Sequence, residues 1–175
     1  MKHLFHVPIL AFGFVVLWSG FSLDQRSRAL AQDDTALPLE QLRVSAEEGD
    51  REAQYRLAEA YRAGIAVERD DGRALELYRL SALQGFAAAQ FRLGEIYEDG
   101  ELLERDMETA IGFYRRAADQ HYAEAQYALA HNYLLGTGVE QDVDAALAWY
   151  RKAALQGHQS SQLALGDQYL SLIHI

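Results

Sequence analysis

The sequence predicts an all-α protein, specifically a right-handed α-solenoid of antiparallel helix hairpins with a 36-residue period. Two observations support this prediction. The same residue types return when the sequence is shifted by 36 residues, a regularity typical of stacked repeat proteins. Within each period, apolar residues also recur at helical spacing. The recurring positions include Ala53, Ala89, Ala125 and Ser161; Gln54, Gln90, Gln126 and Gln162; Leu57, Leu93, Leu129 and Leu165; and Tyr61, Tyr97, Tyr133 and Tyr169.

The first half of each unit is expected to be a helix with one buried face. In the unit at residues 122–157, Ala125, Leu129 and Tyr133 are four residues apart, so they lie on one side of a helix. We expect this side to pack inside the array. The prediction covers the leucines and tyrosines that recur at these positions, namely Leu57, Leu93, Leu129, Tyr61, Tyr97 and Tyr133.

A loop and a second helix complete each unit. Gly136 and Gly138 are expected to end the first helix, and the Asp142 carboxylate can cap the second by accepting from its free amides. Gly157 suits the left-handed conformation at the end of that helix. His121 stands at the equivalent position one unit earlier, where it is expected to adopt the same conformation with some strain. The first two units carry different loop residues, so their turns are expected to differ.

These patterns divide the repetitive part of the chain into units. We expect a half unit at residues 38–49 that caps the stack, full units at 50–85, 86–121 and 122–157, and a partial unit at 158–169. Three units reach the minimum that such arrays usually need, because each unit buries its apolar face only against neighbours. The expected helices are Glu40–Glu48, Arg51–Ala63, Asp71–Gln84, Ala87–Glu98, Met107–Gln120, Ala123–Leu135, Val143–Gln156 and Gln159–Tyr169.

The third unit carries a family pattern. Residues 125–157 read AQYALAHNYLLGTGVEQDVDAALAWYRKAALQG. This stretch resembles the Sel1-like repeat family, which is related to the tetratricopeptide repeat but has a longer loop inside the hairpin. The resemblance extends over about residues 38–169. It implies an α-solenoid that mediates protein–protein interaction.

Both ends of the chain differ from the array. Residues 1–31 combine Lys2, an apolar run from Val7 to Leu23 and a small-residue cleavage site, which predicts a secretory signal peptide followed by a polar linker at 32–37. The alternative is an uncleaved segment that tethers the protein to a membrane. Residues 170–175, LSLIHI, resemble a translated sequencing adapter, so we interpret them as a scar and expect the natural protein to continue beyond Tyr169.

The charge balance bears on the partner. The chain has 16 basic and 26 acidic residues; residues 32–175 have 13 and 25, giving a formal charge of −12 after signal cleavage. An acidic surface repels phosphates, so no nucleic-acid partner is expected, nor stable membrane insertion once the signal is removed. The excess acid either solvates the outer helix faces or favours a basic or neutral partner.

No catalytic site, metal site or cofactor is expected. The chain has no cysteine, so it lacks a thiolate nucleophile and the disulfides of some secreted relatives in the resembled family. Outside the predicted signal peptide and scar, the histidines are His121, His131 and His158, and no two share a helix face. No serine is followed three residues later by lysine. We therefore expect a protein that is not an enzyme.

A binding surface is expected on the concave face of the solenoid, lined by the first helices of the units. Opposite their buried face lie Glu52, Arg56, Glu59, Arg92, Glu95, Asp99, Glu124, Ala128 and His131, which vary between units. An aromatic column at Tyr55, Phe91 and Tyr127 borders this surface. It either packs against the preceding unit or holds a peptide or sugar. The candidate ligand-binding residues are Arg56, Glu59, Arg92, Glu95, Tyr127 and His131.

Two functions follow as hypotheses. The first is an exported, periplasmic or extracellular scaffold that binds a protein or peptide of unknown identity on this surface, as the family resemblance implies. The alternative is a cell-wall or β-lactam-handling enzyme, a chemistry linked to some secreted members of the resembled family. Hydrolysis by the purified protein distinguishes the two.

Overall fold

The computed structural model describes residues 38–173. The predicted signal peptide and linker, together with His174 and Ile175, lie outside the described residues. Residues 38–47 are helical, and seven helices follow. They are α2 (Arg51–Ala63), α3 (Asp71–Leu83), α4 (Ala87–Asp99), α5 (Met107–Asp119), α6 (Ala123–Leu135), α7 (Val143–Leu155) and α8 (Gln159–Ile173).

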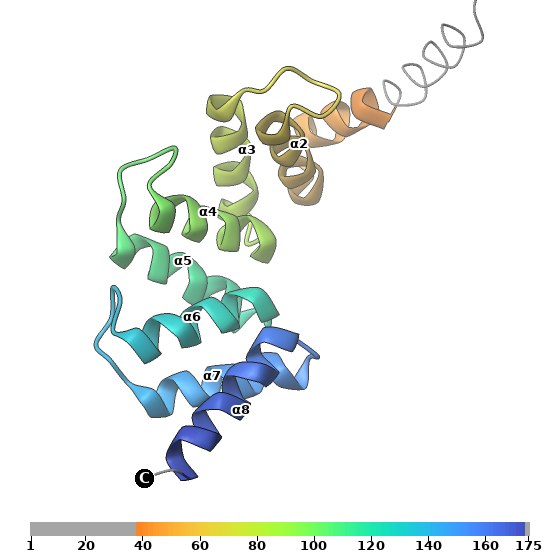
Figure 1. Cartoon of the computed structure of the whole chain (residues 1–175). Coiled ribbons are helices and arrows are strands. Elements are labelled where there is room, and N and C mark those ends of the chain that lie inside the picture. Colours follow the sequence, from red (N-terminus) through yellow and green to blue (C-terminus); the bar gives the residue numbers. More distant parts are fainter. Residues whose placement is uncertain (1–37, 174–175) are drawn as a thin grey trace, which may run out of the picture. The chain divides into compact units, whose positions relative to one another are not determined.

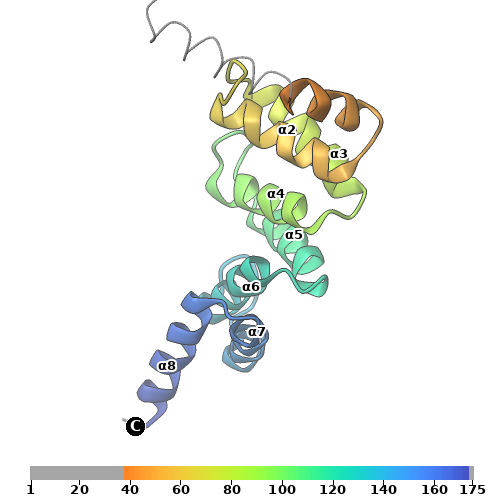
Figure 2. The ribbon, with the colours of Figure 1, turned by 90° about the vertical axis from the view of Figure 1, so that its right-hand side faces the viewer.

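The predicted α-solenoid is confirmed for the described residues, which contain helices and no strand. The helices form the hairpins α2–α3, α4–α5 and α6–α7, and these hairpins stack in chain order (Figures 1 and 2). The predicted bounds of α2 to α7 are correct to within one residue. Helix α8 is longer than predicted, since it continues past Tyr169 to Ile173. Within residues 38–173, no helix combines the length and the apolar composition that a membrane span requires.

Aspartate caps fix where the second helices begin. The carboxylates of Asp70, Asp106 and Asp142 each accept a hydrogen bond from the backbone amide three residues later, at 2.9, 3.1 and 2.9 Å. These amides have no partner within their own helix, so the cap satisfies a donor that would otherwise need water. The sequence prediction for Asp142 is confirmed, and the same device repeats in every hairpin.

Left-handed residues end the helices as predicted. His121 has φ 64°, in the same region as Gly85 (79°) and Gly157 (88°). In the loop after the first helix, Ala66 (60°) and Gly138 (71°) share this conformation at equivalent positions, whereas Leu102 of the second unit has no positive φ. At this position, therefore, the loop of the second unit differs from that of the third unit, as predicted. The loop of the first unit does not differ from it.

The core follows the repeated alanine and leucine positions. Leu57, Leu93, Leu129 and Tyr61 are buried, as predicted. Tyr97 and Tyr133 are only half-buried, so the prediction was wrong for them. Their rings reach the edge of the hairpin, where Tyr97 stacks on Phe113 at 5.8 Å between ring centroids and the Tyr133 hydroxyl accepts from Arg115 Nη2 at 2.9 Å.

A glutamine ladder connects successive units. Gln54, Gln90 and Gln126 donate through Nε2 to the carbonyl oxygens of Ala46, Ala82 and Ala118, each at 3.1 Å. Their Oε1 atoms accept from Gln84, Gln120 and Gln156, each at 2.8 Å. Because these glutamines are buried, both hydrogen bonds offset the cost of removing their amides from water. Residues 38–47 join the ladder through the carbonyl oxygen of Ala46. They therefore contact α2 in the same way that the second helix of each unit contacts the first helix of the next unit.

Candidate functional site

A groove lies between α4 and α6, the first helices of the second and third hairpins. Its volume is about 370 Å³, and α5 and the start of α8 also contribute to its lining. We call it the α4–α6 groove. Its α4 and α6 walls are formed mainly by Glu95, Glu98, Asp99, Glu124, Tyr127 and His131.

Helical spacing explains why these side chains share the groove. Glu95, Glu98 and Asp99 are three and four residues apart on α4, and Glu124, Tyr127 and His131 follow the same spacing on α6. The buried leucines of the two helices, Leu93 and Leu129, belong to the opposite, core-facing side. The groove therefore combines polar residues that differ from unit to unit, such as Glu98, Asp99 and His131, with aromatic residues at recurring positions.

The groove is acidic. Glu98, Asp99 and Glu124 take part in no salt bridge among the described residues. Burial raises the pKa of the Tyr114 hydroxyl well above its ordinary value, and the hydrogen bond to Glu98 and the charges of Glu98, Glu95 and Asp99 raise it further. Several carboxylates thus act on one point, so the groove has a negative potential.

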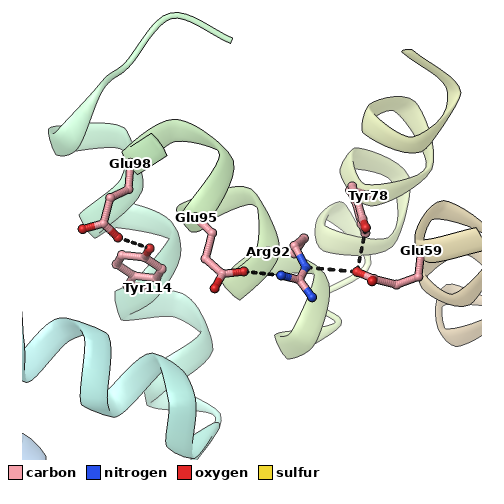
Figure 3. A network of polar contacts seen from close by, with 6 residues as sticks. All are labelled: Glu59, Tyr78, Arg92, Glu95, Glu98 and Tyr114. Atoms are coloured by element: carbon pink, nitrogen blue, oxygen red, sulfur yellow. Dashed lines mark hydrogen bonds and ion pairs between the residues drawn. The ribbon is translucent and has the colours of Figure 1, made fainter. Parts of the chain in front are cut away.

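An ion network connects the groove to the first hairpin (Figure 3). Arg92 on α4 contacts Glu59 on α2 at 3.0 Å and Glu95 at 2.6 Å, and Glu59 also accepts from the Tyr78 hydroxyl at 2.6 Å. Burial lowers the pKa of the Arg92 guanidinium, but Glu95 and Glu59 outweigh it and raise that pKa above its ordinary value. Burial also raises the pKa of Glu95, and Arg92 opposes this rise. Arg92 therefore joins two units.

The tyrosines of the second helices reach different partners in successive hairpins. Tyr78 donates to Glu59 on α2, whereas Tyr114 donates to Glu98 on α4, one helical turn further along (Figure 3). Gly94 explains the difference, because a Cβ at this position would lie 2.5 Å from Cε1 of Tyr114. The glycine makes room for the Tyr114 ring, and the ring brings its hydroxyl to the groove wall.

The aromatic column packs between units. Tyr127 contacts the rings of Tyr150 at 5.6 Å and His158 at 5.0 Å between centroids. Tyr55 and Phe91 make equivalent contacts with Tyr78 and Phe86 and with Tyr114 and Tyr122. The predicted packing against the preceding unit was wrong, since the partners are the second helix of the same unit and the residue that opens the next. Tyr127 still lines the groove, and it also stacks on His131 at 6.3 Å.

Asn132 is a buried polar residue in the groove lining. The residue is 2% exposed, and its Nδ2 donates to the Ala128 carbonyl oxygen at 2.9 Å. The equivalent positions in the first two units are Ala60 and Ile96, so the amide replaces apolar side chains at this point of the repeat. None of the hydrogen bonds found between described residues engages its Oδ1.

The six predicted site residues fall into three groups. Glu95, Tyr127 and His131 lie together in the groove. Glu59 and Arg92 lie beside it in the ion network. Arg56 lies apart from both, exposed and paired with Glu52 on its own helix. The helical wheel missed Glu98 and Asn132; for Asn132 the signal was the polar residue in an otherwise apolar repeat column.

The described part of the chain contains no group of three or more histidine, aspartate or glutamate side chains that could hold a metal ion. The groove carboxylates carry negative charge and accept hydrogen bonds. Because they converge on an open groove with aromatic walls, they are placed to receive groups that donate hydrogen bonds.

Comparisons with known proteins agree with this architecture. The model of the Sel1 repeat matches residues 51–86, 87–122 and 123–158. The chain is similar to a Sel1 repeat protein from Oxalobacter formigenes, with 35% identity over 74% of this chain and 98% of that protein, at a TM-score of 0.71. The search among curated proteins gave no match.

Two further solved structures are similar. One is c5321, described as a protective antigen of uropathogenic Escherichia coli, with 36% identity and a TM-score of 0.74. The match covers 76% of this chain but only 28% of c5321. The other is cysteine rich protein B of Helicobacter pylori, with 16% identity over 73% of this chain and 96% of that protein, at a TM-score of 0.59, which shows a shared fold alone.

Proposed function

Because the chain belongs to the Sel1 repeat family, we propose that it is an exported, non-catalytic scaffold that binds a protein or peptide in the α4–α6 groove. Sel1 repeats commonly form helical scaffolds for protein–protein interaction and are typically not enzymes. Export is inferred from the sequence of residues 1–31, which has the order of charge, apolar run and small residues found in secretory signals.

The observation that supports this proposal best is the position of the groove. It lies between first helices and gathers Glu98, Asp99 and His131, which differ from their counterparts in the other units, next to a buried scaffold that repeats. In a repeat protein, positions that hold units together recur, whereas a surface fitted to a partner is free to differ. Glu59 and Arg92 keep α4 in place beside the groove, and Arg56 offers an exposed charge farther along the first-helix face.

Peptide selection with a blocked groove tests the proposal. Ala128 is half-buried in the lining, so Ala128→Trp fills the groove from α6. A random peptide library displayed on phage is selected on the full chain, and the selected peptides are assayed on wild type, on Ala128→Trp and on the control Leu155→Trp. Leu155 is 88% exposed and lies outside the groove lining, so the control adds the same ring elsewhere.

The proposal expects selected peptides to bind wild type and the Leu155→Trp control and to lose binding to Ala128→Trp. Circular dichroism must show that both variants keep the helical content of wild type. Equal binding to all three proteins, with their fold intact, would place the binding surface outside the groove and overturn the proposal.

A further inference from the structure

We propose that the α4–α6 groove binds the cationic side chain of an arginine or lysine in the partner's peptide segment. This inference rests on the proposed function and specifies the chemistry of the partner. The carboxylates of the groove walls accept hydrogen bonds and donate none when ionised. Arginine and lysine side chains carry only donors, so their charge and hydrogen-bonding capacity both complement these walls.

Most carboxylates of the groove have no ion-pair partner within residues 38–173. Of its four carboxylates, Glu95 alone is in a salt bridge among the described residues, through Arg92 on the same helix. Asp99 and Glu124 are on opposite walls, α4 and α6, and both are exposed. Like charges that line one groove repel, and a cation bound among them relieves that repulsion. A guanidinium or ammonium group in the groove is therefore attracted by the carboxylates of its lining.

The aromatic lining favours the same ligand. Phe91, Tyr114 and Tyr127 line the groove together with the carboxylates. The faces of aromatic rings attract cations, and they also pack against the methylene stem of lysine or arginine. An apolar ligand would use the rings but leave the carboxylates without compensation. An anionic ligand would be repelled by them.

Asn132 provides an observation independent of the acidic residues. It is a buried amide at a repeat position that is apolar in the first two units, and it lines the groove. Its Nδ2 is used within α6, and its Oδ1 adds a neutral acceptor to the lining. A hydrogen-bond acceptor at this point of the lining complements a donor that enters the groove.

The size of the groove also fits. Its volume of about 370 Å³ lies at the lower end of the range of ligand pockets, roughly 300–1,000 Å³. This space accommodates one long side chain with the adjacent backbone, and not a folded domain. We therefore expect one anchoring arginine or lysine per partner segment, with the flanking residues lying along the first helices.

A positional-scanning peptide library provides the test. In each pool one position is fixed as arginine, lysine, citrulline, glutamate or leucine, and citrulline is the matched control because it keeps the shape of arginine without the charge. Binding to the full chain is measured by fluorescence anisotropy at about pH 8 and low ionic strength, where carboxylates are ionised and weakly screened. The assay is repeated on a groove variant with Glu98→Gln, Asp99→Asn and Glu124→Gln.

A second variant controls for net charge. Glu47→Gln, Glu48→Gln and Glu76→Gln neutralise the same number of exposed carboxylates outside the groove lining. We expect arginine or lysine pools to bind about tenfold or more tighter than the citrulline pool, the scale of one lost charge-assisted hydrogen bond. This preference is expected to vanish in the groove variant and to persist in the charge control. Glu124→Gln alone repeats the test with one exposed side chain, should the triple variant unfold.

The outcomes separate the inference from the proposed function. If glutamate, leucine or citrulline pools bind as well as arginine pools, and binding is still lost with Ala128→Trp, the groove binds peptides but the cation specificity is wrong. If the arginine preference is equal in the groove variant and the charge control, the preference reflects overall charge, and the inference is overturned. If no pool is sensitive to Ala128→Trp, the proposed function itself fails.

Discussion

Gly94 and Tyr114 are complementary across the second hairpin: the tyrosine ring occupies the space that a side chain at Gly94 would need. Alanines stand at the equivalent positions of the neighbouring units, Ala58 and Ala130, and both are fully buried. The missing methyl group allows the Tyr114 hydroxyl to reach Glu98 on the groove wall. One repeat position therefore distinguishes the second hairpin, which forms the α4 wall of the groove.

Replacing this glycine is expected to destabilise the protein. In Gly94→Ala the new Cβ would approach Cε1 and Cδ1 of Tyr114 to 2.5 and 2.6 Å, so the ring must move. Overpacking of this kind costs about 1 to 3 kcal/mol, which urea unfolding measures. The control is Gly112→Ala on α5, where a Cβ meets nothing within 4 Å and a helical alanine is expected to be neutral or stabilising. Equal stability of the two variants would contradict the role assigned to Gly94.

The two predicted site arginines are expected to differ in their effect on stability. Arg92→Met removes contacts to Glu59 and Glu95 that bridge two units, and the side chain of Arg92 is only 26% exposed. Networked, partly screened pairs of this kind contribute about 1 kcal/mol. Arg56→Met removes one pair within α2 at 66% exposure, so its effect is expected to be within about 0.5 kcal/mol. Thermal unfolding of both variants measures the difference, and a larger loss for Arg56→Met would show that the network is not cohesive.

Core packing is tested at Leu93, which is 2% exposed. Leu93→Ala is expected to lower the free energy of unfolding by about 2 to 5 kcal/mol, because it removes buried methyl groups and leaves a cavity. Leu83 is 83% exposed, and Leu83→Ala is expected to change stability by no more than about 0.5 kcal/mol. Chemical denaturation distinguishes the two. Similar losses would mean that the buried face of the first helices is assigned wrongly.

The Asp106 cap is expected to give a pH-dependent contribution to stability. Hydrogen bonds from the side chain and backbone of Thr109 hold the pKa of Asp106 below its ordinary value of 3.8. A lowered folded-state pKa stabilises the fold above the ordinary value, and this contribution is lost as pH falls through the lowered pKa. The stability difference between wild type and Asp106→Ala should therefore shrink below pH 3.8. A difference that is constant across this range in urea unfolding would argue against the cap.

Much of the fold could be predicted because the same helix caps and helix ends recur in each repeat unit. The recurrence of Asp70, Asp106 and Asp142, each followed by a helix, located the second helices to within a residue. His121 was predicted to be left-handed because its position is glycine in other units, and its φ of 64° agrees. The prediction that Tyr97 and Tyr133 are buried was wrong. A helical wheel gives the direction of a side chain, but it does not show where the neighbouring helix stops covering that side chain.

The candidate site was only partly predictable for the same reason. Opposite-face spacing placed Glu95, Tyr127 and His131 on one surface, and the structure brings them into one groove. The helical wheel could not show that Arg92 forms a salt bridge with Glu59 of the preceding unit, because that contact depends on how two hairpins pack together. Nor could it show that Tyr114 reaches Glu98, which depends on the space left by Gly94.

Amide chemical shifts report directly whether a partner peptide occupies the α4–α6 groove. A peptide selected from the phage library is titrated into the isotopically labelled full chain, and two-dimensional NMR spectra are recorded. We expect shifts to concentrate on the amides of residues 91–99 and 124–132, and to be absent with Ala128→Trp. Shifts confined to α3, α5 and α7, with residues 91–99 and 124–132 unchanged, would contradict occupancy of the groove.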